Sequence, residues 1–301
     1  MWKIGKILNA EQLIEKAFRR AKKKKGLEKI EEIRETLNDS LKRYVRDFPS
    51  FDNLHPFYYE LIDLLIGINK IKKSLSSVEW ARKKILLISR EGMKKIRKGE
   101  DARKIITGLY GRISSLLRQV DEDLKFIENA RIKISKMPSI STDISTIVIA
   151  GYPNVGKSSI LSILSTAKPE IAPYPFTTKG LVVGHFYINK GYEEEKIQII
   201  EAPGLLDRPI EEKNEIEKQA LVALKYLPKA IIFVLDASMH CGYPLENQFN
   251  LLEEIKKMFK VKIIVVENKV DLSGGKTDYI KISCKTMDGI KELKEKIKEL
   301  V

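Results

Sequence analysis

The stretch Gly151-Tyr152-Pro153-Asn154-Val155-Gly156-Lys157-Ser158 decides the fold of the second half of this chain. Two glycines separated by four residues and followed by Lys and Ser form the phosphate-loop pattern. Glycines let backbone N–H groups turn inward around phosphates, and the helix that follows offers its positive N-terminus. The stretch lies between an apolar run and a helical pattern, which is the context that the motif requires. We therefore predict a nucleotide phosphate site here.

Two side chains at the end of this loop are expected to meet the phosphates and a metal ion. Lys157 should reach the β- and γ-phosphates, and the hydroxyl of Ser158 should ligate Mg²⁺. The residues that we expect to contact the nucleotide in this region are Asn154, Val155, Gly156, Lys157, Ser158 and Ser159.

A second motif, Asn268-Lys269-Val270-Asp271, selects the base and follows the apolar run 261–266. The Asp271 carboxylate can accept the ring and exocyclic N–H groups of guanine, an array that adenine lacks. Losing such a pair should cost several orders of magnitude in affinity. Lys269 would lie along the base plane, and Asn268 would brace the phosphate loop. An ordinary polar loop is the alternative, but the position after a later strand favours a site for GTP and GDP.

A shorter motif, Ser283-Cys284-Lys285, follows the next strand and is expected to complete the base pocket. The backbone N–H of Cys284 is a candidate donor to the guanine carbonyl. This motif is weak evidence by itself, and it gains weight only from the two motifs that precede it.

Two further segments are candidate switches. Tyr174-Pro175-Phe176-Thr177-Thr178 supplies hydroxyls for Mg²⁺ and the γ-phosphate, with Thr178 assigned to both roles and Thr177 kept as its alternative. Glu201-Ala202-Pro203-Gly204 follows the strand 197–200, and GTPases usually carry Asp-x-x-Gly there. Glu201 is the third candidate for the metal site, beside Ser158 and Thr178. The Gly204 N–H would contact the γ-phosphate and be released on hydrolysis. Lys157, Thr178 and Gly204 are the candidate catalytic groups.

The two halves of the chain have different periodicities. Residues 1–137 read as long amphipathic helices, over about 27–48, 57–97 and 101–136, after a capping box at Asn9 and Gln12. An antiparallel helical bundle is expected there. Residues 138–143 read as a turn-rich hinge. Residues 144–301 alternate β-branched runs with helical stretches, which predicts an α/β domain with a mostly parallel sheet flanked by helices.

The charge is concentrated in the first half. Of the net charge of +14, residues 1–143 hold 33 Lys and Arg against 20 Asp and Glu, whereas residues 144–301 hold 22 against 21. A basic domain beside a neutral one indicates contact with a polyanion such as RNA. A lysine-rich surface that serves thermal stability is the alternative, but it predicts that Glu rises with Lys.

Other classes of protein are disfavoured by the composition. The two cysteines, Cys241 and Cys284, have no paired spacing, which argues against a disulfide framework or a zinc site and suits a reducing cytosol. His240-Cys241 lacks the further partners that a metal site needs. Neither a signal peptide nor a membrane-length apolar run is present. A cytoplasmic protein without membrane contact is expected.

These motifs resemble those of a known family. The phosphate loop, Tyr-Pro-Phe-Thr-Thr-Lys at 174–179 and Gly-Leu-Leu-Asp-Arg-Pro at 204–209 look like the Obg-like P-loop GTPases. Within that group the chain is similar over its whole length to the Nog family of nucleolar GTP-binding proteins. Because it ends at Val301, we expect the compact archaeal form without a long C-terminal extension. The stretches that favour this family are 167–173, Asn214-Glu215-Ile216-Glu217 and Cys241-Gly242-Tyr243.

The resemblance implies GTP binding and hydrolysis during maturation of the large ribosomal subunit, with ribosomal RNA as a partner and a monomer off the ribosome. Glu201 stands where the family has Asp, which affects Mg²⁺ binding or turnover. Leu205 stands where many GTPases have a water-orienting Gln, so slow intrinsic hydrolysis is expected. Asn154 matches a position that helps bind K⁺ in potassium-stimulated relatives, and a loop-bracing role is the equal alternative.

Three functions remain open at this point. The first is a slow GTPase switch whose two nucleotide states differ in affinity for a pre-ribosomal particle. The second is a nucleotide-stabilised placeholder on RNA with incidental hydrolysis. The third is a GTPase that regulates another RNA machine, such as one for tRNA modification.

Overall fold

The computed structural model describes residues 2–174, 180–190 and 193–300. The chain forms two compact units, and neither is a single stretch of sequence. One unit comprises Met1–Leu54 with Leu65–Lys136, and the other comprises His55–Leu64 with Met137–Val301. We call them the bundle unit and the sheet unit. The segment His55–Leu64 thus groups with the sheet, although its sequence pattern placed it in the bundle.

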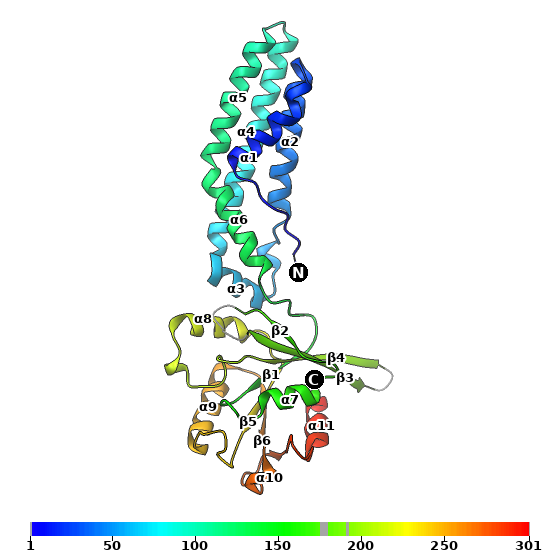
Figure 1. The fold of residues 1–301 in the computed structure, drawn as a ribbon, viewed down its shortest axis with the longest axis vertical. Coiled ribbons are helices and arrows are strands. Elements are labelled where there is room, and N and C mark those ends of the chain that lie inside the picture. The colour runs from blue at the N-terminus through cyan, green and yellow to red at the C-terminus, as the bar shows by residue number, and fades with distance from the viewer. Residues whose placement is uncertain (1, 175–179, 191–192, 301) are drawn as a thin grey trace. The chain divides into compact units, whose positions relative to one another are not determined.

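The bundle unit is built from long helices joined by short connections (Figure 1). Its first helix begins at the predicted capping box. The Asn9 side chain accepts the Gln12 N–H at 2.9 Å, and the Gln12 side chain accepts the Asn9 N–H at 3.1 Å. The elements of this unit are α1 (Ala10–Arg20), η1 (Ala21–Lys23), α2 (Gly26–Arg46), η2 (Phe51–Asn53), α4 (Ile68–Arg97), α5 (Ala102–Gln119) and α6 (Asp121–Ser135).

Two of the predicted long helices are each divided in two. Gly67 separates α3 (Pro56–Ile66) from α4, and its φ of +88° lies in the left-handed region that favours glycine. Val120 separates α5 from α6 with a φ of −103°. The next residue, Asp121, accepts the Ala10 N–H at 2.7 Å, so the break positions a carboxylate that ties the N-terminal segment to α6.

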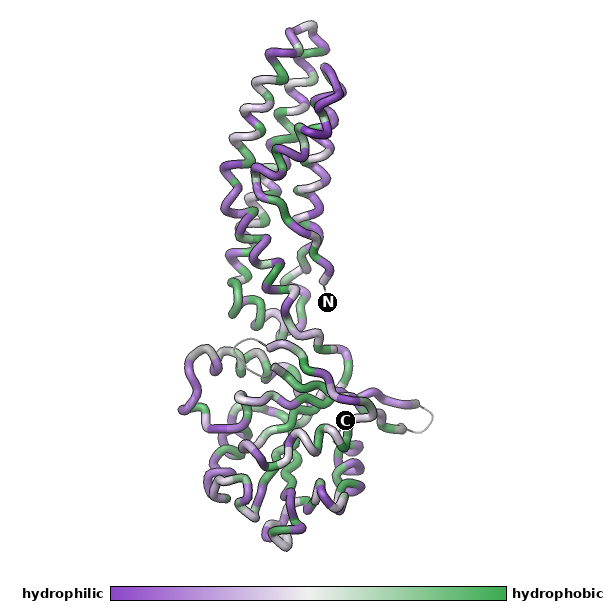
Figure 2. The backbone as a smooth tube through the Cα atoms, in the orientation of Figure 1, coloured by the Kyte–Doolittle hydropathy of each residue, from purple (hydrophilic) through white to green (hydrophobic). Residues whose placement is uncertain are grey.

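The apolar stripe that the sequence predicts on α2 forms part of the bundle core. Ile30, Ile33, Leu37 and Leu41 are completely buried, and Figure 2 shows apolar positions interspersed with polar ones along the helices. Each such side chain contributes about 1.5–3 kcal/mol on burial. The packing of this stripe therefore accounts for much of the stability of α2.

The described residues of the sheet unit form a seven-stranded sheet in the order β2-β3-β4-β1-β5-β6-β7. Strand β1 pairs in parallel with β4 and β5, and the parallel pairing continues through β6 to β7. Strand β3 is antiparallel to β4 and β2, so the predicted mostly parallel sheet is confirmed. The strands are β1 (Thr146–Ala150), β2 (Glu170–Ala172), β3 (Leu181–Lys190), β4 (Glu193–Glu201), β5 (Ala230–Leu235), β6 (Lys262–Glu267) and β7 (Ile280–Lys281).

Helices flank this sheet, as the alternating pattern predicted (Figure 1). Strand β2 and helix α10 are short elements that the pattern did not reveal. Because β1, β4, β5 and β6 are parallel, the loops that follow them lie at one edge of the sheet, where ligands bind in such folds. The helical elements are α7 (Lys157–Leu164), η3 (Ile210–Glu212), α8 (Glu215–Leu224), α9 (Leu245–Met258), α10 (Val270–Ser273) and α11 (Ile290–Leu300).

Two aromatic side chains of α3 pack within the sheet unit. Phe57 is completely buried and stacks on Tyr174, with ring centroids 6.2 Å apart and an interplanar angle of 19°. The Tyr58 hydroxyl donates to the Ile140 carbonyl at 2.7 Å and accepts the Ile140 N–H at 3.0 Å. In addition, the Tyr174 hydroxyl donates to the Ala220 carbonyl in α8 at 2.7 Å. Helix α3 is therefore held by the segment before β1 and by the start of the first candidate switch.

Within the part of the chain that the structure describes, no helix combines the length and the apolarity that a membrane crossing requires.

We expect Tyr58→Phe to lower the free energy of unfolding by about 1–2 kcal/mol, because the Ile140 N–H loses its acceptor. Urea denaturation followed by circular dichroism measures this change, and amide exchange at residues 138–141 should accelerate. Tyr59→Phe is the matched control, since Tyr59 is 37% exposed. Equal behaviour of the two variants would contradict the assignment.

Candidate nucleotide-binding site

The phosphate loop connects β1 to α7 with a backbone that needs its glycines. Gly151 has a φ of +135° and Gly156 a φ of +104°. A Cβ at Gly151 would lie 2.5 Å from the Val234 carbonyl oxygen, and one at Gly156 would collide with the Asn268 amide. Conformation and space thus both exclude larger residues. Asn154, also left-handed at +63°, is exposed on the loop.

Lys157 begins α7 and places a buried charge inside the loop. Its side chain is 7% exposed, and its Nζ donates to the carbonyls of Gly151 at 2.9 Å and Tyr152 at 2.8 Å. Burial lowers the pKa of Lys157, and the carboxylates of Glu201 and Asp207 oppose that shift. An ammonium held by two carbonyls can gain a stronger, charge-assisted partner in a phosphate. The arrangement fits an anion site.

Ser158 and Glu201 meet where the metal site was predicted. The Ser158 hydroxyl donates to the Glu201 carboxylate at 2.7 Å, and Glu201 is the 5%-exposed last residue of β4. Mg²⁺ takes oxygen ligands and keeps several waters, so these groups fit a ligand and an acceptor for its water shell. Glu201, although longer than the Asp usual at this position, therefore still contacts the Ser158 hydroxyl that would ligate the metal. Ser159 is exposed on α7, and Thr177 and Thr178 lie outside the described residues.

The second candidate switch is tied to the phosphate loop. The Gly151 N–H donates to the Leu206 carbonyl at 2.9 Å, and Leu205 is 1% exposed. The Gly204 N–H, which we expected to contact a γ-phosphate, donates to the Asp207 carboxylate at 2.8 Å. The other Asp207 oxygen is buried without a hydrogen-bond partner among the described residues. Asp207 therefore occupies the N–H that we expect to contact the γ-phosphate.

The segment after this switch carries a buried cation that sequence reasoning missed. Lys213 is 4% exposed and donates to the Arg208 carbonyl at 2.7 Å. Burial lowers the pKa of Lys213 to about 8, with the Asp207 carboxylate acting in the opposite direction. Arg208 in turn pairs with Glu217 at 2.9 Å. These contacts fix the chain between the switch and α8.

Asn268 joins three loops of the site. Its side-chain amide donates to the Val155 carbonyl at 2.8 Å, and its side-chain oxygen accepts the Cys284 N–H at 3.2 Å. Val155 is completely buried and Asn268 is 2% exposed. The Cys284 N–H, which we expected to donate to a guanine carbonyl, thus donates to Asn268 in this structure. The base motif, the phosphate loop and the Ser283-Cys284-Lys285 loop form one hydrogen-bonded assembly.

Asp271 lies in α10 and is exposed, while one of its oxygens accepts the Ser283 hydroxyl at 2.7 Å. Ser283 is completely buried, and its hydroxyl also accepts the N–H groups of Lys285 at 3.3 Å and Thr286 at 3.1 Å. A fixed serine thus orients the carboxylate that we assigned to guanine. Lys285 itself is exposed at the end of this loop.

The orientation of Lys269 depends on Asp236, an acid that belongs to none of the predicted motifs. Lys269 has a φ of +62°, and its Nζ donates to Asp236 at 2.7 Å. Asp236 is completely buried after β5 and also accepts the Cys241 N–H at 2.8 Å. Burial would raise the pKa of Asp236, but hydrogen bonds from Lys269 and Ser238 lower it below its usual range. The sequence offered one signal for Asp236. It is an acid directly after an apolar strand, at the edge of the sheet that carries the phosphate loop.

The chain matches family models in both halves. Residues 3–141 match the NOG1 N-terminal helical domain, and residues 215–271 match the model described as Nucleolar GTP-binding protein 1 (NOG1).

Relatives match over most of the chain. An uncharacterized protein of Methanocaldococcus jannaschii is 41% identical over 290 residues, which cover 90% of this chain and 80% of that protein. Nucleolar GTP-binding protein 1 of Drosophila melanogaster is 34% identical over 248 residues, which cover 81% of this chain and 37% of that protein. A crystal structure described as nucleolar GTP-binding protein 1 of Plasmodium falciparum is 32% identical with a TM-score of 0.48, covering 55% of this chain and 89% of that one.

We expect Asp207→Ala to raise the affinity for a non-hydrolysable GTP analogue about tenfold relative to GDP, because it frees the Gly204 N–H and removes a nearby negative charge. Titration calorimetry gives the ratio. Glu211→Ala is the control, since it removes an exposed charge from η3. A ratio that is unchanged, or that moves toward GDP, would show that Asp207 does not compete with the phosphate.

Proposed function

This chain belongs to the NOG1 family of GTP-binding proteins, and from that premise we propose that it is a slow GTPase switch in assembly of the large ribosomal subunit. The observation that carries the nucleotide part is the double contact of Asn268 with the phosphate loop and the Cys284 loop. It makes base recognition and phosphate binding parts of one structure, which supports guanine nucleotides as ligands.

In this proposal Asp271 selects guanine, and Ser283 and Asp236 are positioning residues. Ser283 holds Asp271, while Asp236 holds Lys269 along the plane of the base. Lys157 and the loop N–H groups would hold the phosphates, and Ser158 with Glu201 would hold Mg²⁺, which supplies charge stabilisation when bound. Thr178, or Thr177 as its alternative, would complete that site.

Slow hydrolysis is proposed because Leu205 is buried and apolar, so it cannot polarise an attacking water. The exposed Asn154 would contact a K⁺ ion beside the phosphates. Single-turnover hydrolysis with and without large-subunit particles tests the switch. Stimulation by the particles is the expected result. Equal, negligible turnover in both would replace the switch by a nucleotide-stabilised placeholder on RNA.

The bundle unit is proposed to contact ribosomal RNA, because the surplus of positive charge lies in residues 1–143. Several of the acids there are neutralised locally, as in the Glu79–Arg82 and Glu128–Arg131 pairs. The run Lys22–Lys25 is exposed. Relatives named nucleolar GTP-binding protein 1 support a role in ribosome assembly, and we propose the large-subunit precursor as the partner. We propose that a monomer acts there in the cytoplasm.

We expect Asp271→Asn to reduce GTP and GDP affinity about a hundredfold or more and to weaken discrimination against xanthine nucleotides, since the carboxylate pairs with two guanine N–H groups. Isothermal titration with both bases measures the change. Asp278→Asn, at an exposed acid before β7, is the control. Unchanged guanine affinity would remove Asp271 from the base site.

We expect binding of the whole chain to large-subunit ribosomal RNA to weaken about a hundredfold or more between roughly 50 and 200 mM salt. Replacing Lys22, Lys23, Lys24 and Lys25 by Gln should reduce both the affinity and this salt slope, as filter binding would show. The control removes the same charge from α11, at the exposed lysines 291, 294, 296 and 298. Equal effects of the two sets, or a flat salt dependence, would argue against RNA binding by the bundle.

A further inference from the structure

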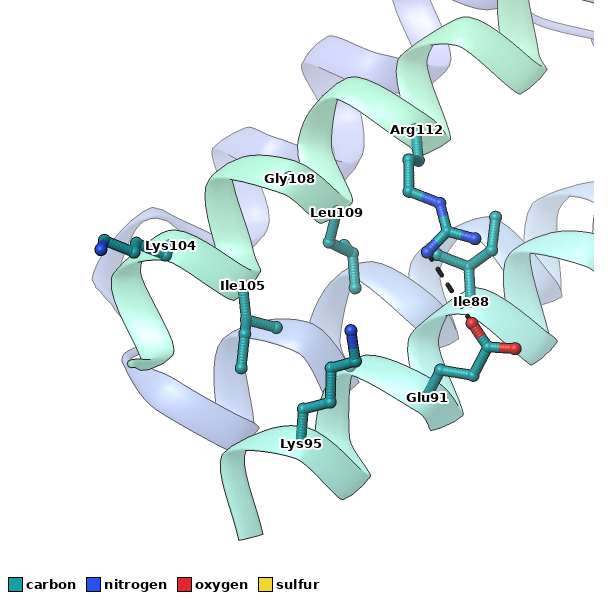
Figure 3. Close-up of a pocket in the computed structure, with 9 residues that line it drawn as sticks. Ile88, Glu91, Lys95, Lys104, Ile105, Gly108, Leu109 and Arg112 are labelled. Carbon is teal, nitrogen blue, oxygen red and sulfur yellow. Dashed lines mark ion pairs between the residues drawn. The ribbon is translucent and has the colours of Figure 1, made fainter. Parts of the chain in front are cut away.

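The bundle unit contains a cavity of about 310 Å³ between α4 and α5 (Figure 3). Its walls combine apolar side chains, glycines and long cationic side chains, and all of them come from these two helices. The residues that line it are Ile88, Glu91, Gly92, Lys95, Lys104, Ile105, Gly108, Leu109 and Arg112.

Two of the residues that line the cavity, Gly92 and Gly108, have no side chain. A Cβ added at Gly108 would meet no atom within 4 Å, whereas one at Gly92 would lie 3.1 Å from Leu109. Glycine inside a helix is less favourable than alanine. Gly108 therefore keeps a space open at a cost in helix stability.

The floor of the cavity is apolar. Ile88 is 8% exposed and Leu109 is 3% exposed, while Ile105 is half-buried at the side. Phosphates alone would gain nothing from such a floor. A flat apolar group, by contrast, would be removed from water against it.

The rim of the cavity is cationic. Lys95, Lys104 and Arg112 are exposed around it. Arg112 lies 3.7 Å from Glu91, and the side chains of this pair are 59% and 50% exposed, so the pair is weak and can exchange for another anion. Lys95 and Lys104 form no ion pair with any residue that the structure describes.

The surface around the cavity is also basic. Residues 90–112 contain eight Lys and Arg against three Asp and Glu. The start of α2 packs here, because a Cβ at Gly92 would lie 3.5 Å from Ile30 and Lys29 lies 5.7 Å from the centre of the Tyr110 ring. The exposed run Lys22–Lys25 directly precedes this start. An apolar cavity thus opens onto a surface that suits a polyanion.

We propose that this cavity takes one unpaired nucleotide of an RNA, with its base against Ile88, Ile105 and Leu109. Lys95, Lys104 and Arg112 pair with the phosphates on either side of it. The inference rests on the proposed function, that the bundle binds RNA, and it specifies RNA with an unpaired nucleotide as the ligand. Proteins read RNA mainly at unpaired bases that can leave the stack, and a fully paired helix has no base to insert.

Gly108→Leu tests this inference, because the leucine fills open space and replaces a helix-breaking residue by a helix former. Gly111→Leu is the matched control: Gly111 is equally open, lies one turn away and does not line the cavity. The probes are two fluorescein-labelled RNA hairpins, one fully paired and one with a single bulged nucleotide of mixed base identity. Anisotropy titrations use the full chain.

Wild type and Gly111→Leu should bind the bulged hairpin about tenfold more tightly than the paired one, which burial of one base face against aliphatic side chains can supply. Gly108→Leu should lose this preference and keep its affinity for the paired hairpin. Steep salt dependence without a preference in wild type, or a preference that survives Gly108→Leu, overturns the inference and leaves RNA binding by the bundle intact.

Two other outcomes have separate meanings. If wild type binds neither hairpin at 50 mM salt, the inference and the proposed RNA contact fail together. A glutamate-rich peptide could displace the bulged hairpin from the wild-type protein, and Gly108→Leu could abolish binding of that peptide. The cavity would then be a site for an acidic protein segment, which overturns the inference.

Discussion

The side-chain amide of Asn268 is the contact on which the nucleotide site depends. It is buried and bonded on one side to the Val155 carbonyl and on the other to the Cys284 N–H. Because a buried amide that loses a partner costs about 1–3 kcal/mol in desolvation of the group left behind, moving one loop without the other is unfavourable. The Lys157 ammonium and the Asp271 carboxylate are therefore held in fixed relation, although 114 positions of sequence separate them. In the proposed function, phosphate affinity and base choice are properties of one hydrogen-bonded edge of the sheet.

The parts of this site that sequence predicts well are those fixed by local backbone chemistry. Gly151 and Gly156 predict the loop. Their positive φ values and the atoms that a Cβ would meet both exclude a side chain at these positions. Asp236 was missed because its partner, Lys269, follows 33 residues later, and an isolated acid after a strand carries no motif. Gly67 was read as part of a continuous helix because a glycine can occur within one, and only its φ shows the break. The predicted fold class was correct, while the short elements β2 and α10 have too few residues to show a period.

The two units differ in net charge, and this difference does not depend on any single residue. In the bundle, acids are commonly paired within a helix; side-chain hydrogen bonds from Arg82 lower the pKa of Glu79 against the effect of burial. Each such pair cancels one negative and one positive charge, so the surplus of exposed lysines and arginines sets the surface potential of the bundle. In the sheet unit the charges nearly balance, so the few buried ionic groups, such as Lys157 and Asp236, act only at short range. The bundle can then attract polyanions at long range, while the sheet unit can bind one ligand through short-range contacts.

The discontinuity of the two units has a consequence for synthesis on the ribosome. Helix α3 is made before most of the bundle, yet the ring that covers Phe57 belongs to Tyr174, more than a hundred residues later. At about 5–20 residues per second, the nascent chain would carry that uncovered aromatic helix for roughly 5 to 20 s. The bundle can close on either side of it during that time, since α2, α4, α5 and α6 are complete by Ser135. Folding of the nucleotide-binding half would then bury a segment translated long before, so this half matures only after Tyr174 and the strands that follow it have been synthesised.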